Sequence, residues 1–350
     1  MSHRLVQPVT RQHFKAQKMA TPDISVIVPT FNRASLLPKA LETCLAQRHQ
    51  NIEIIVSDNC SSDNTSETVQ PFLKDPRLKY YRNEENLGMM GNWKKCIYDR
   101  CNADWFLLMS DDDYFTDPDY LSLAWDAIST HSPKLVYAGG RVVDASSGEI
   151  RHLDLPFSGL VKGIDVFKSR GTVRPQDFIL SNVVFNRQAV IDFNFPRNKF
   201  NLSSDSELFL TLCLEGDVYA VPKRVMDYTL HSGNFVSKIS RVKELYTNNN
   251  DHLIYPYLHA IQKNIDINDL KEFTKNSNLR NIIVNTLINL DLVNPNWHQE
   301  YRNQLMKIMP QYLNEIESSF YFHKKKIKAF LLQRKYRKNL HLSEIAHGDY

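Results

Sequence analysis

Residues 105–115 constrain this chain most, because five apolar residues are followed within one position by three carboxylates. The apolar run 105–109 is typical of a strand buried in a parallel sheet. Asp111, Asp112 and Asp113 would each lose hydration inside a core, so we expect them at the carboxyl end of that strand. Adjacent carboxylates repel unless a cation joins them, and oxygen ligands suit Mg²⁺ or Mn²⁺. The segment predicts a divalent metal ion that binds a diphosphate. The alternative is a solvated acidic loop without a function.

Short apolar strands alternate with helical patterns in the first half of the chain. Alternation at this pace predicts an α/β fold with a doubly wound, mainly parallel sheet. A mixed extension of the sheet is expected further on. The expected strands are 24–29, 52–56, 78–81, 105–109, 135–137, 142–143, 183–185 and 218–221, and the expected helices are 34–47, 64–73, 93–100, 121–130 and 203–213.

Polar residues follow each of the first four expected strands. The carboxyl ends of parallel strands meet at one edge of a sheet, where ligands bind in open α/β folds. We therefore expect four loops to converge on one rim, which is harder to explain by chance than any single motif. The polar residues are, in chain order, Thr30 and Asn32, Asp58, Asn86 and Gly88, and the three aspartates.

Composition is ordinary for a globular chain, with 42% hydrophobic and 23% charged residues among 350. The net charge of +4 is too small to indicate nucleic-acid binding by itself. Residues 1–22 lack an apolar signal core, and no window approaches 18 apolar residues, so no membrane span is expected. The five cysteines have no regular spacing, which favours free thiols in a reducing cytoplasm.

We expect three regions: a flexible arm at 1–23, an α/β domain at 24–238 and a helical region at 239–350. Residues 323–338 mix basic side chains with Ile327, Phe330 and two leucines. Such a helix can lie on an anionic membrane, where each base contributes about 1 kcal/mol. The alternative is a solvated basic face above a packed apolar stripe. Nucleic acid is not expected as a partner, because no base-reading motif accompanies the segment.

Residues 24–238 resemble the inverting family 2 glycosyltransferases, which have the GT-A fold. Residues 24–33 resemble the opening strand and turn of that family. Residues 57–63 resemble its second acidic turn, and 110–114 match its DXD motif. Three motifs in order, at the spacing of the family, form a specific signal. The resemblance implies a GT-A sheet, doubly wound and mixed but mainly parallel, with a helical appendage after it.

The resemblance also implies a binding site for a nucleotide-sugar donor. Asp58 would accept a hydrogen bond from N3–H of uracil or thymine, a donor that cytosine lacks. Asp63 is expected to serve only turn formation and helix capping. The remaining contacts implied are Pro29, Thr30 and Asn32 at the base and ribose, and Asn86 and Gly88 at the diphosphate or ribose.

The DXD resemblance implies bound Mn²⁺ or Mg²⁺. Asp113 is the expected direct ligand, and Asp111 is expected at the ribose or at metal-bound water. Asp112 can take either role, because the triplet allows two registers of the motif. His231 resembles a third metal ligand that some members carry on a later strand; a structural histidine is the alternative. Residues 232–237 would then form a lid that excludes water.

An inverting transfer needs a base for the acceptor hydroxyl, whose own pKa lies far above 7. Members of the family carry Glu-Asp before an apolar helix, and here the pair is Ser204 and Asp205. Asp205 is the expected base and Glu207 the fallback. The alternative for Asp205 is an ordinary acidic residue at a helix N-terminus, where the helix dipole favours it.

The resemblance therefore implies transfer of a sugar from a UDP- or dTDP-sugar to a saccharide acceptor. Three other classes of protein are the alternatives. A nucleotidyltransferase would carry a glycine-rich first turn, and residues 29–33 contain no glycine. An aspartate phosphatase would carry its aspartates after the first strand, not the fourth. A catalytically silent binding protein stays open because Ser204 replaces glutamate. The basic segment suggests a lipid-linked saccharide of a surface polysaccharide as acceptor, and a cytoplasmic enzyme at the inner face of the membrane.

Overall fold

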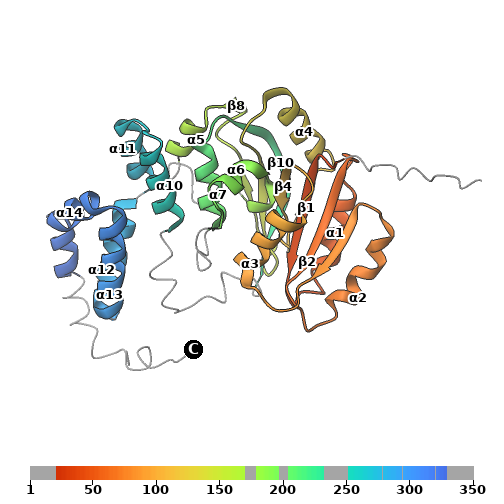
Figure 1. The fold of residues 1–350 in the computed structure, drawn as a ribbon, viewed down its shortest axis with the longest axis horizontal. Helices are drawn as coiled ribbons and strands as arrows, with labels where there is room; N and C mark the ends of the chain where they lie inside the picture. The colour runs from red at the N-terminus through yellow and green to blue at the C-terminus, as the bar shows by residue number, and fades with distance from the viewer. Residues whose placement is uncertain are drawn as a thin grey trace, which may run out of the picture.

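The computed structural model describes residues 21–169, 179–196, 204–231 and 251–328, apart from residues 278, 294 and 320. The strands in these ranges are β1 Ile24–Thr30, β2 Ile52–Asp58, β3 Leu78–Arg82, β4 Trp105–Leu108, β5 Tyr114–Phe115, β6 Leu135–Asp144, β7 Ile150–Leu153, β8 Gly159–Val161, β9 Val183–Asn186 and β10 Val218–Leu230. They form one sheet, in the order β3-β2-β1-β4-β9-β6-β10-β5, with β7 beside β6 and β8 beside β10 (Figure 1).

The sheet is mixed but mainly parallel, as the strand–helix alternation predicts. β1 pairs in parallel with β2 and β4, and β2 pairs in parallel with β3. β9 is antiparallel to β4 and β6, and β10 is parallel to β6. Every residue of β2 is buried, and β1 is buried except at Pro29. Burial on both faces explains why these strands are nearly continuous apolar runs.

Helices cover both faces of this sheet. One core, with Leu41, Val69 and Ile128, joins the sheet to helices near the N-terminus and to the helix after β5. The other core contains Trp93 and Leu208 on the opposite face. The helices are α1 Leu37–Leu45, α2 Thr65–Val69, α3 Gly88–Lys95, α4 Tyr120–His131, α5 Gly163–Ser169, α6 Arg187–Asp192, α7 Ser204–Cys213, α10 Asp251–Gln262, α11 Ile267–Asn276, α12 Leu279–Val293, α13 Pro295–Ile308 and α14 Pro310–Ser318, with short turns η1 Gln70–Lys74, η2 Cys96–Arg100 and η3 Leu180–Asn182.

β6 is one long strand, whereas the apolar pattern predicts two short ones at 135–137 and 142–143. Gly139 and Gly140 interrupt the pattern but stay in the strand, because neighbouring backbone lies where a side chain would be. A Cβ at Gly139 would lie 2.6 Å from the carbonyl oxygen of Leu153, and one at Gly140 would lie 3.0 Å from that of Met226. The glycines are therefore a packing requirement of the sheet and not a turn.

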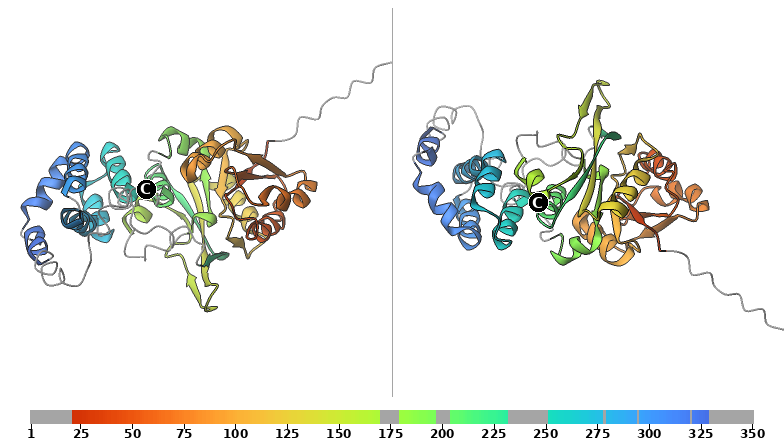
Figure 2. Two further views of the ribbon diagram at one scale, coloured as in Figure 1. Left: turned by 90° about the horizontal axis from the view of Figure 1, so that it is seen from below. Right: turned by 90° about the horizontal axis from the view of Figure 1, so that it is seen from above.

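The C-terminal helices are confirmed over the described part of 251–328. α10 packs on α7 and α11 packs on α5, so these helices lie beside the sheet-bearing part (Figure 2). The rings of Phe167 in α5 and Phe273 in α11 stack with their centroids 4.0 Å apart. Apolar residues of both parts belong to one continuous core. The expected boundaries at 23 and 238 stay predictions, and the expected lid at 232–237 lies outside the described residues.

The five cysteines carry free thiols, as expected, and burial raises the pKa of Cys101 to about 12. In the described ranges, no helix combines the length and the apolar character needed to cross a bilayer.

Glu53 is a buried acid near the start of β2, 3% exposed. Its carboxylate accepts hydrogen bonds from Ser25 Oγ at 2.6 Å, from the backbone N–H of Asn102 at 2.7 Å and from Lys79 Nζ at 2.8 Å. Burial acts to raise its pKa, but these donors together hold it below the usual value. The carboxylate thereby joins β1, β2, β3 and the approach to β4.

Replacing Phe273 by alanine should lower the free energy of unfolding by about 3–5 kcal/mol, because it leaves a cavity beside Phe167 in the shared core. Urea unfolding followed by circular dichroism measures the change. Ile327→Ala, at a side chain that is 62% exposed, serves as the control and should stay within about 0.5 kcal/mol. A loss confined to the helical region, with a separate transition for the sheet, would contradict a shared core.

Replacing Glu53 by glutamine should cost roughly 1–3 kcal/mol at pH 7, because buried donors lose a charged acceptor. The pKa of Glu53 is lowered by folding, so its charge stabilises the fold above the unfolded value of about 4.3 and stops doing so as pH falls below it. The difference in the free energy of unfolding between wild type and variant, measured by urea unfolding, should therefore become smaller toward pH 3. Glu42→Gln, at an exposed glutamate of α1, should show no such change.

Candidate functional site

The carboxyl ends of β1, β2 and β4 meet at one rim of the sheet. The β1–β2 register places Thr30 opposite Asp58. The N–H of Met109 donates to the carbonyl oxygen of Ile27, so the chain leaves β4 beside the end of β1. Thr30 Oγ1 then donates to Asp111 Oδ2 at 2.7 Å. The predicted convergence of loops on this rim is therefore present for these strands.

The three aspartates of the triplet have different surroundings. One nitrogen of Arg33 lies 3.0 Å from Asp111 Oδ1 and 2.6 Å from Asp112 Oδ2. Asp112 Oδ2 also lies 3.1 Å from Nε2 of His231. Asp113 points inward and accepts hydrogen bonds from Ser181 Oγ at 2.8 Å and from the N–H of Thr229 at 3.3 Å.

Burial opposes the ionisation of two of these carboxylates. It raises the pKa of Asp111 to about 6, and the neighbouring Arg33 and Thr30 limit the rise. Burial, together with the charge of Asp112, raises the pKa of Asp113 to about 8. In the described part of the chain, the groups that donate to Asp113 are neutral. A positive charge at this place would stabilise the ionised form.

The residues at the rim fit a divalent cation that a diphosphate completes. Ligands at about 2.1 Å in octahedral geometry lie about 3 Å apart, which is close to the 3.1 Å between Asp112 Oδ2 and His231 Nε2. Among the described residues, no three carboxylates, imidazoles or thiols converge as a complete metal site. Mg²⁺ is commonly held by one or two carboxylates with substrate phosphates and water supplying the rest.

His231 and Asp205 reach the rim from later parts of the chain. β10 runs in the same direction as β1 and β4, so His231 at its end lies at the same rim. α7 runs back before β10, and its first turn carries Asp205. The pKa of the Tyr228 hydroxyl is raised to about 12 by burial and then by the charges of Asp113, Asp112 and Asp205. The charges of Asp205 and of the acidic triplet therefore both act on the Tyr228 hydroxyl.

The two candidates for the base differ in exposure. Asp205 is half-buried, and its Oδ1 accepts a hydrogen bond from the N–H of Ser206 at 2.7 Å. Glu207 is fully buried within α7. Asp205 is therefore the candidate that an incoming acceptor can reach, and the assignment of either residue stays a prediction.

Asp58 lies at the other end of the rim and is 1% exposed. Its carboxylate accepts hydrogen bonds from the Tyr80 hydroxyl at 2.6 Å and from the N–H of Ser61 at 2.8 Å, and Arg82 Nε lies 3.5 Å away. Each carboxylate oxygen has two acceptor positions, so a further N–H donor can still be accommodated. Asp58 is thus rigidly held, as recognition of a base edge requires.

Asn59 positions the loop that carries Asn86 and Gly88. Its side-chain nitrogen donates to Asn86 Oδ1 at 2.7 Å and to the carbonyl oxygen of Gly88 at 3.3 Å. Gly88 has φ +71°, a left-handed value that favours glycine. It begins α3, five residues earlier than the helix expected at 93. The loop is therefore tied to the residue that follows Asp58.

Pro29 and Asn32 have structural roles at the first turn. Pro29 is half-buried and stands opposite Ser57 in the β1–β2 ladder. Asn32 is exposed with φ +53°, and its Oδ1 accepts a hydrogen bond from the N–H of Ser62 at 2.7 Å. Asp63 forms the expected turn, because its carboxylate accepts from the N–H groups of Ala34 and Thr65. The N-cap of α2 is Asn64, which makes no side-chain cap hydrogen bond.

Several side chains of the site escape analysis of the sequence. Arg33 was visible as a basic residue in the first turn, but only the fold pairs it with the triplet. Ser181 carries no local signal, because it comes from η3, 68 residues beyond Asp113. Arg100 is 9% exposed, and its guanidinium donates hydrogen bonds to Ser57 Oγ and Asn83 Oδ1. It thereby supports the chain before the loop that carries Asn86 and Gly88.

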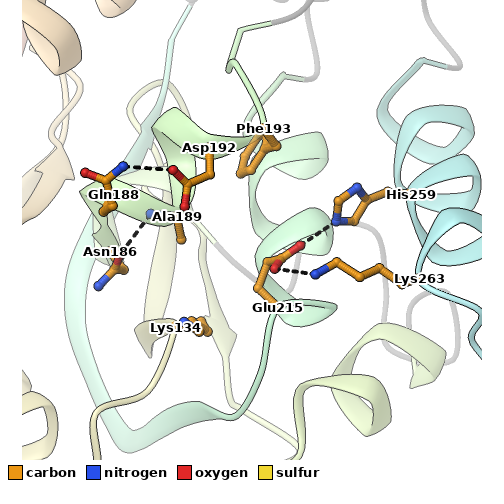
Figure 3. A pocket seen from close by; sticks show the side chains of 9 residues that line it. All are labelled: Lys134, Asn186, Gln188, Ala189, Asp192, Phe193, Glu215, His259 and Lys263. Atoms are coloured by element: carbon orange, nitrogen blue, oxygen red, sulfur yellow. Dashed lines mark hydrogen bonds and ion pairs between the residues drawn. The ribbon is translucent and has the colours of Figure 1, made fainter.

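A cavity of about 400 Å³ lies at the opposite edge of the sheet, between α6, the end of α7 and α10 (Figure 3). Glu215 accepts hydrogen bonds there from His259 and from Lys263, and these contacts join the end of α7 to α10. None of the predicted site residues lines this cavity. Its lining is Lys134, Asn186, Gln188, Ala189, Asp192, Phe193, Glu215, His259 and Lys263.

Comparison with known sequences gives a family and partial relatives. Residues 25–192 match the family model described as Glycosyl transferase family 2. GalNAc(5)-diNAcBac-PP-undecaprenol beta-1,3-glucosyltransferase of Campylobacter jejuni is 44% identical over 94 residues, which are 26% of this chain and 30% of that protein. Succinoglycan biosynthesis protein ExoO of Rhizobium meliloti is 29% identical over 92 residues, 26% of each chain. The chain thus spans less than a third of the length of either relative.

Comparison with solved structures covers nearly the whole chain. TarS 1–349 of S. aureus in complex with UDP-GlcNAc aligns with a TM-score of 0.63 at 15% identity, over 90% of this chain and 92% of that one. The mannosyltransferase PcManGT of Pyrobaculum calidifontis, in complex with GDP-Man and Mn²⁺, aligns with a TM-score of 0.53 at 15% identity, over 92% and 89%. Residues 25–192, slightly less than half of the chain, thus match the glycosyl transferase family 2 model, and the chain has the GT-A-type fold of these solved structures.

Proposed function

We propose that this protein is a metal-dependent, inverting glycosyltransferase that moves a sugar from a UDP- or dTDP-sugar to a hydroxyl of a saccharide acceptor. The observation that carries the proposal is the meeting of the acidic triplet with Thr30, Arg33 and His231 at one rim of the sheet, with Asp205 near enough for its charge to act on the Tyr228 hydroxyl. A site of this kind has both parts that the reaction needs: carboxylates for a cation at the leaving diphosphate, and a separate carboxylate for the incoming hydroxyl.

The donor nucleotide would lie along the rim from Asp58 to the triplet. Asp58 accepts N3–H of the uracil or thymine, while Tyr80 and Arg82 keep its carboxylate in place. Thr30 holds Asp111 toward the ribose, and the loop at Asn86 and Gly88 closes on the donor from the other side. A solved relative by fold binds UDP-GlcNAc, which supports this class of donor.

Asp113 and His231 would hold Mn²⁺ or Mg²⁺, with Asp112 between them. When bound, the cation supplies Lewis-acid stabilisation of the charge that builds on the departing diphosphate. Asp113 is buried among neutral donors, so its negative charge favours a cation there over solvent. Ser181 and the N–H of Thr229 fix the direction of its carboxylate. Tyr228 packs beside these groups and limits the access of water.

Asp205 would take the proton of the acceptor hydroxyl as that oxygen attacks the anomeric carbon. Its place in the first turn of α7 favours the ionised form, because the helix dipole stabilises a negative charge there. Packing of α10 and α11 on α7 and α5 holds the helix rigidly. Attack from the face opposite the leaving diphosphate inverts the anomeric centre.

A lipid-linked saccharide of a surface polysaccharide is the proposed acceptor. The relatives' names, an undecaprenol-linked saccharide transferase and a succinoglycan biosynthesis protein, support this class. Lys324, Ile327 and Lys328 are exposed, whereas Lys325 and Lys326 contact Asn285 and Asp291 of α12. This end of the molecule would rest on an anionic membrane at the cytoplasmic face. The rest of the basic segment, 329–338, lies outside the described residues.

Asp113→Asn should lower the rate of UDP release from UDP-sugars in Mn²⁺ at least 100-fold, because the cation at the diphosphate loses a charged ligand. Calorimetry should show that Mn²⁺ no longer strengthens UDP binding. Asp119→Asn, at an aspartate that pairs with the exposed Arg48, is the control and should behave as wild type. Equal rates for Asp113→Asn and wild type would exclude Asp113 as a ligand.

Asp205→Asn should reduce transfer by roughly 10²–10⁴-fold and leave the affinity for UDP in Mn²⁺ within about twofold, because a general base acts on the acceptor only. Product formation and calorimetry measure the two effects. Asp217→Asn, at an exposed aspartate beyond the end of α7, is the matched control. Full activity of Asp205→Asn, with loss in Glu207→Gln, would move the role to Glu207. If neither wild type nor any variant released UDP from any UDP- or dTDP-sugar, the chain would be a binding protein.

A further inference from the structure

Arg33 pairs with two of the three carboxylates of the acidic triplet. Its terminal nitrogen lies 2.6 Å from Asp112 Oδ2 and 3.0 Å from Asp111 Oδ1, so it bridges two neighbouring carboxylates. The side chains of both aspartates are 6% exposed, whereas that of Arg33 is 22% exposed. The guanidinium therefore approaches the carboxylates from the solvent side, where a ligand would enter.

The bridge has a clear electrostatic reason. Two carboxylates that are largely removed from water repel each other strongly, and a guanidinium between them offsets that repulsion. A divalent cation held by Asp113 and His231, with Asp112 between them, would do the same for the triplet, with two positive charges in place of one. Because Asp112 Oδ2 accepts from both Arg33 and His231, a cation at that oxygen competes directly with Arg33.

The first turn is built so that the side chain of Arg33 can move while its backbone stays in place. The residue before it is tied down twice, by Asn32 N–H to Ser61 Oγ at 2.9 Å and by Ser62 N–H to Asn32 Oδ1 at 2.7 Å. The residue after it is held by Ala34 N–H to Asp63 Oδ2 at 3.0 Å. The backbone on both sides of Arg33 is therefore fixed, and a movement away from the carboxylates is a movement of its side chain.

We propose that Arg33 is a positioning residue that neutralises Asp111 and Asp112 before the metal arrives and then turns to the diphosphate of the donor. This inference rests on the proposed function, because it assumes a metal and a diphosphate at this rim. A guanidinium that a cation displaces from the carboxylates stays beside them, because only its side-chain torsions change. Its planar set of N–H donors matches the oxygens of a phosphate. The exchange makes metal and donor binding cooperative: the metal frees the group that then holds the diphosphate.

Titration of Mn²⁺ into nucleotide-free protein, with free Mn²⁺ measured by electron paramagnetic resonance, tests the first half. Arg33→Gln keeps a hydrogen-bond donor but loses the charge, so it should bind Mn²⁺ about tenfold more tightly than wild type. Arg33→Lys keeps the charge on a single ammonium and should fall between the two. Arg48→Met, at an exposed arginine paired with Asp119, is the matched control and should equal wild type.

Titration of UDP in saturating Mn²⁺ tests the second half, with calorimetry as the readout. Arg33→Gln should bind UDP about tenfold more weakly, and UDP should strengthen Mn²⁺ binding less than it does in wild type. Equal or weaker Mn²⁺ binding by Arg33→Gln overturns the displacement, and unchanged UDP affinity overturns the contact with the diphosphate. If Arg33→Gln does not fold, Arg33→Lys decides in the same way, by tighter or unchanged Mn²⁺ binding.

Asp113→Asn in the same Mn²⁺ titration separates this inference from the proposed function. Loss of Mn²⁺ binding in that variant, with equal binding by wild type and Arg33→Gln, would leave the metal site in place and remove the role of Arg33. Wild-type Mn²⁺ binding by Asp113→Asn would instead exclude Asp113 as a ligand, and a wild-type protein that bound no Mn²⁺ would remove the metal site and the proposed function with it.

Discussion

The carboxylates that follow β4 lie at the border between a dry core and solvent, and the rest of the site is arranged around their charge. Burial raises the pKa of Asp113 to about 8 and that of Asp111 to about 6. Such groups stay ionised only with positive charge or strong donors nearby. Thr30, Arg33 and Ser181 answer that need from three separate elements. This concentration of negative charge would attract a cation to the rim.

Parallel pairing of β1, β2 and β4 brings the parts of the site together. The register aligns Thr30 with Asp58 and sets the chain after β4 beside the end of β1. β10 runs in the same direction, so it delivers His231 to the same rim. One antiparallel strand, β9, interrupts the parallel order between β4 and β6, and the antiparallel β5 ends the sheet beside β10. The mixed sheet thus serves one edge, and the cavity at the opposite edge carries none of the predicted residues.

The helical region is part of how the site is held. α10 packs on α7, which begins with the candidate base, and Glu215 ties the end of α7 to His259 and Lys263. One apolar core runs from the sheet through α7 to α14. Packing of α10 on α7 and the shared core hold the helix that carries Asp205. The C-terminal helices therefore support the helix of the candidate base, and they are not only a separate appendage.

Local pattern in the sequence was enough to place the first four strands, their parallel direction and the rim where polar residues gather. The reason is that burial on both faces of a sheet imposes apolar runs, and each run ends where its strand ends. The motifs also placed Asp58, the triplet and Asp205 in order along the chain. Tertiary structure alone decided that Arg33 bridges Asp111 and Asp112, that Asp113 turns inward to Ser181, and that Gly139 and Gly140 lie inside one strand. Some of those contacts join residues that are tens of positions apart, and the others depend on the backbone of a neighbouring strand. Local periodicity does not predict which strands will be neighbours, so the sequence alone could not predict these contacts.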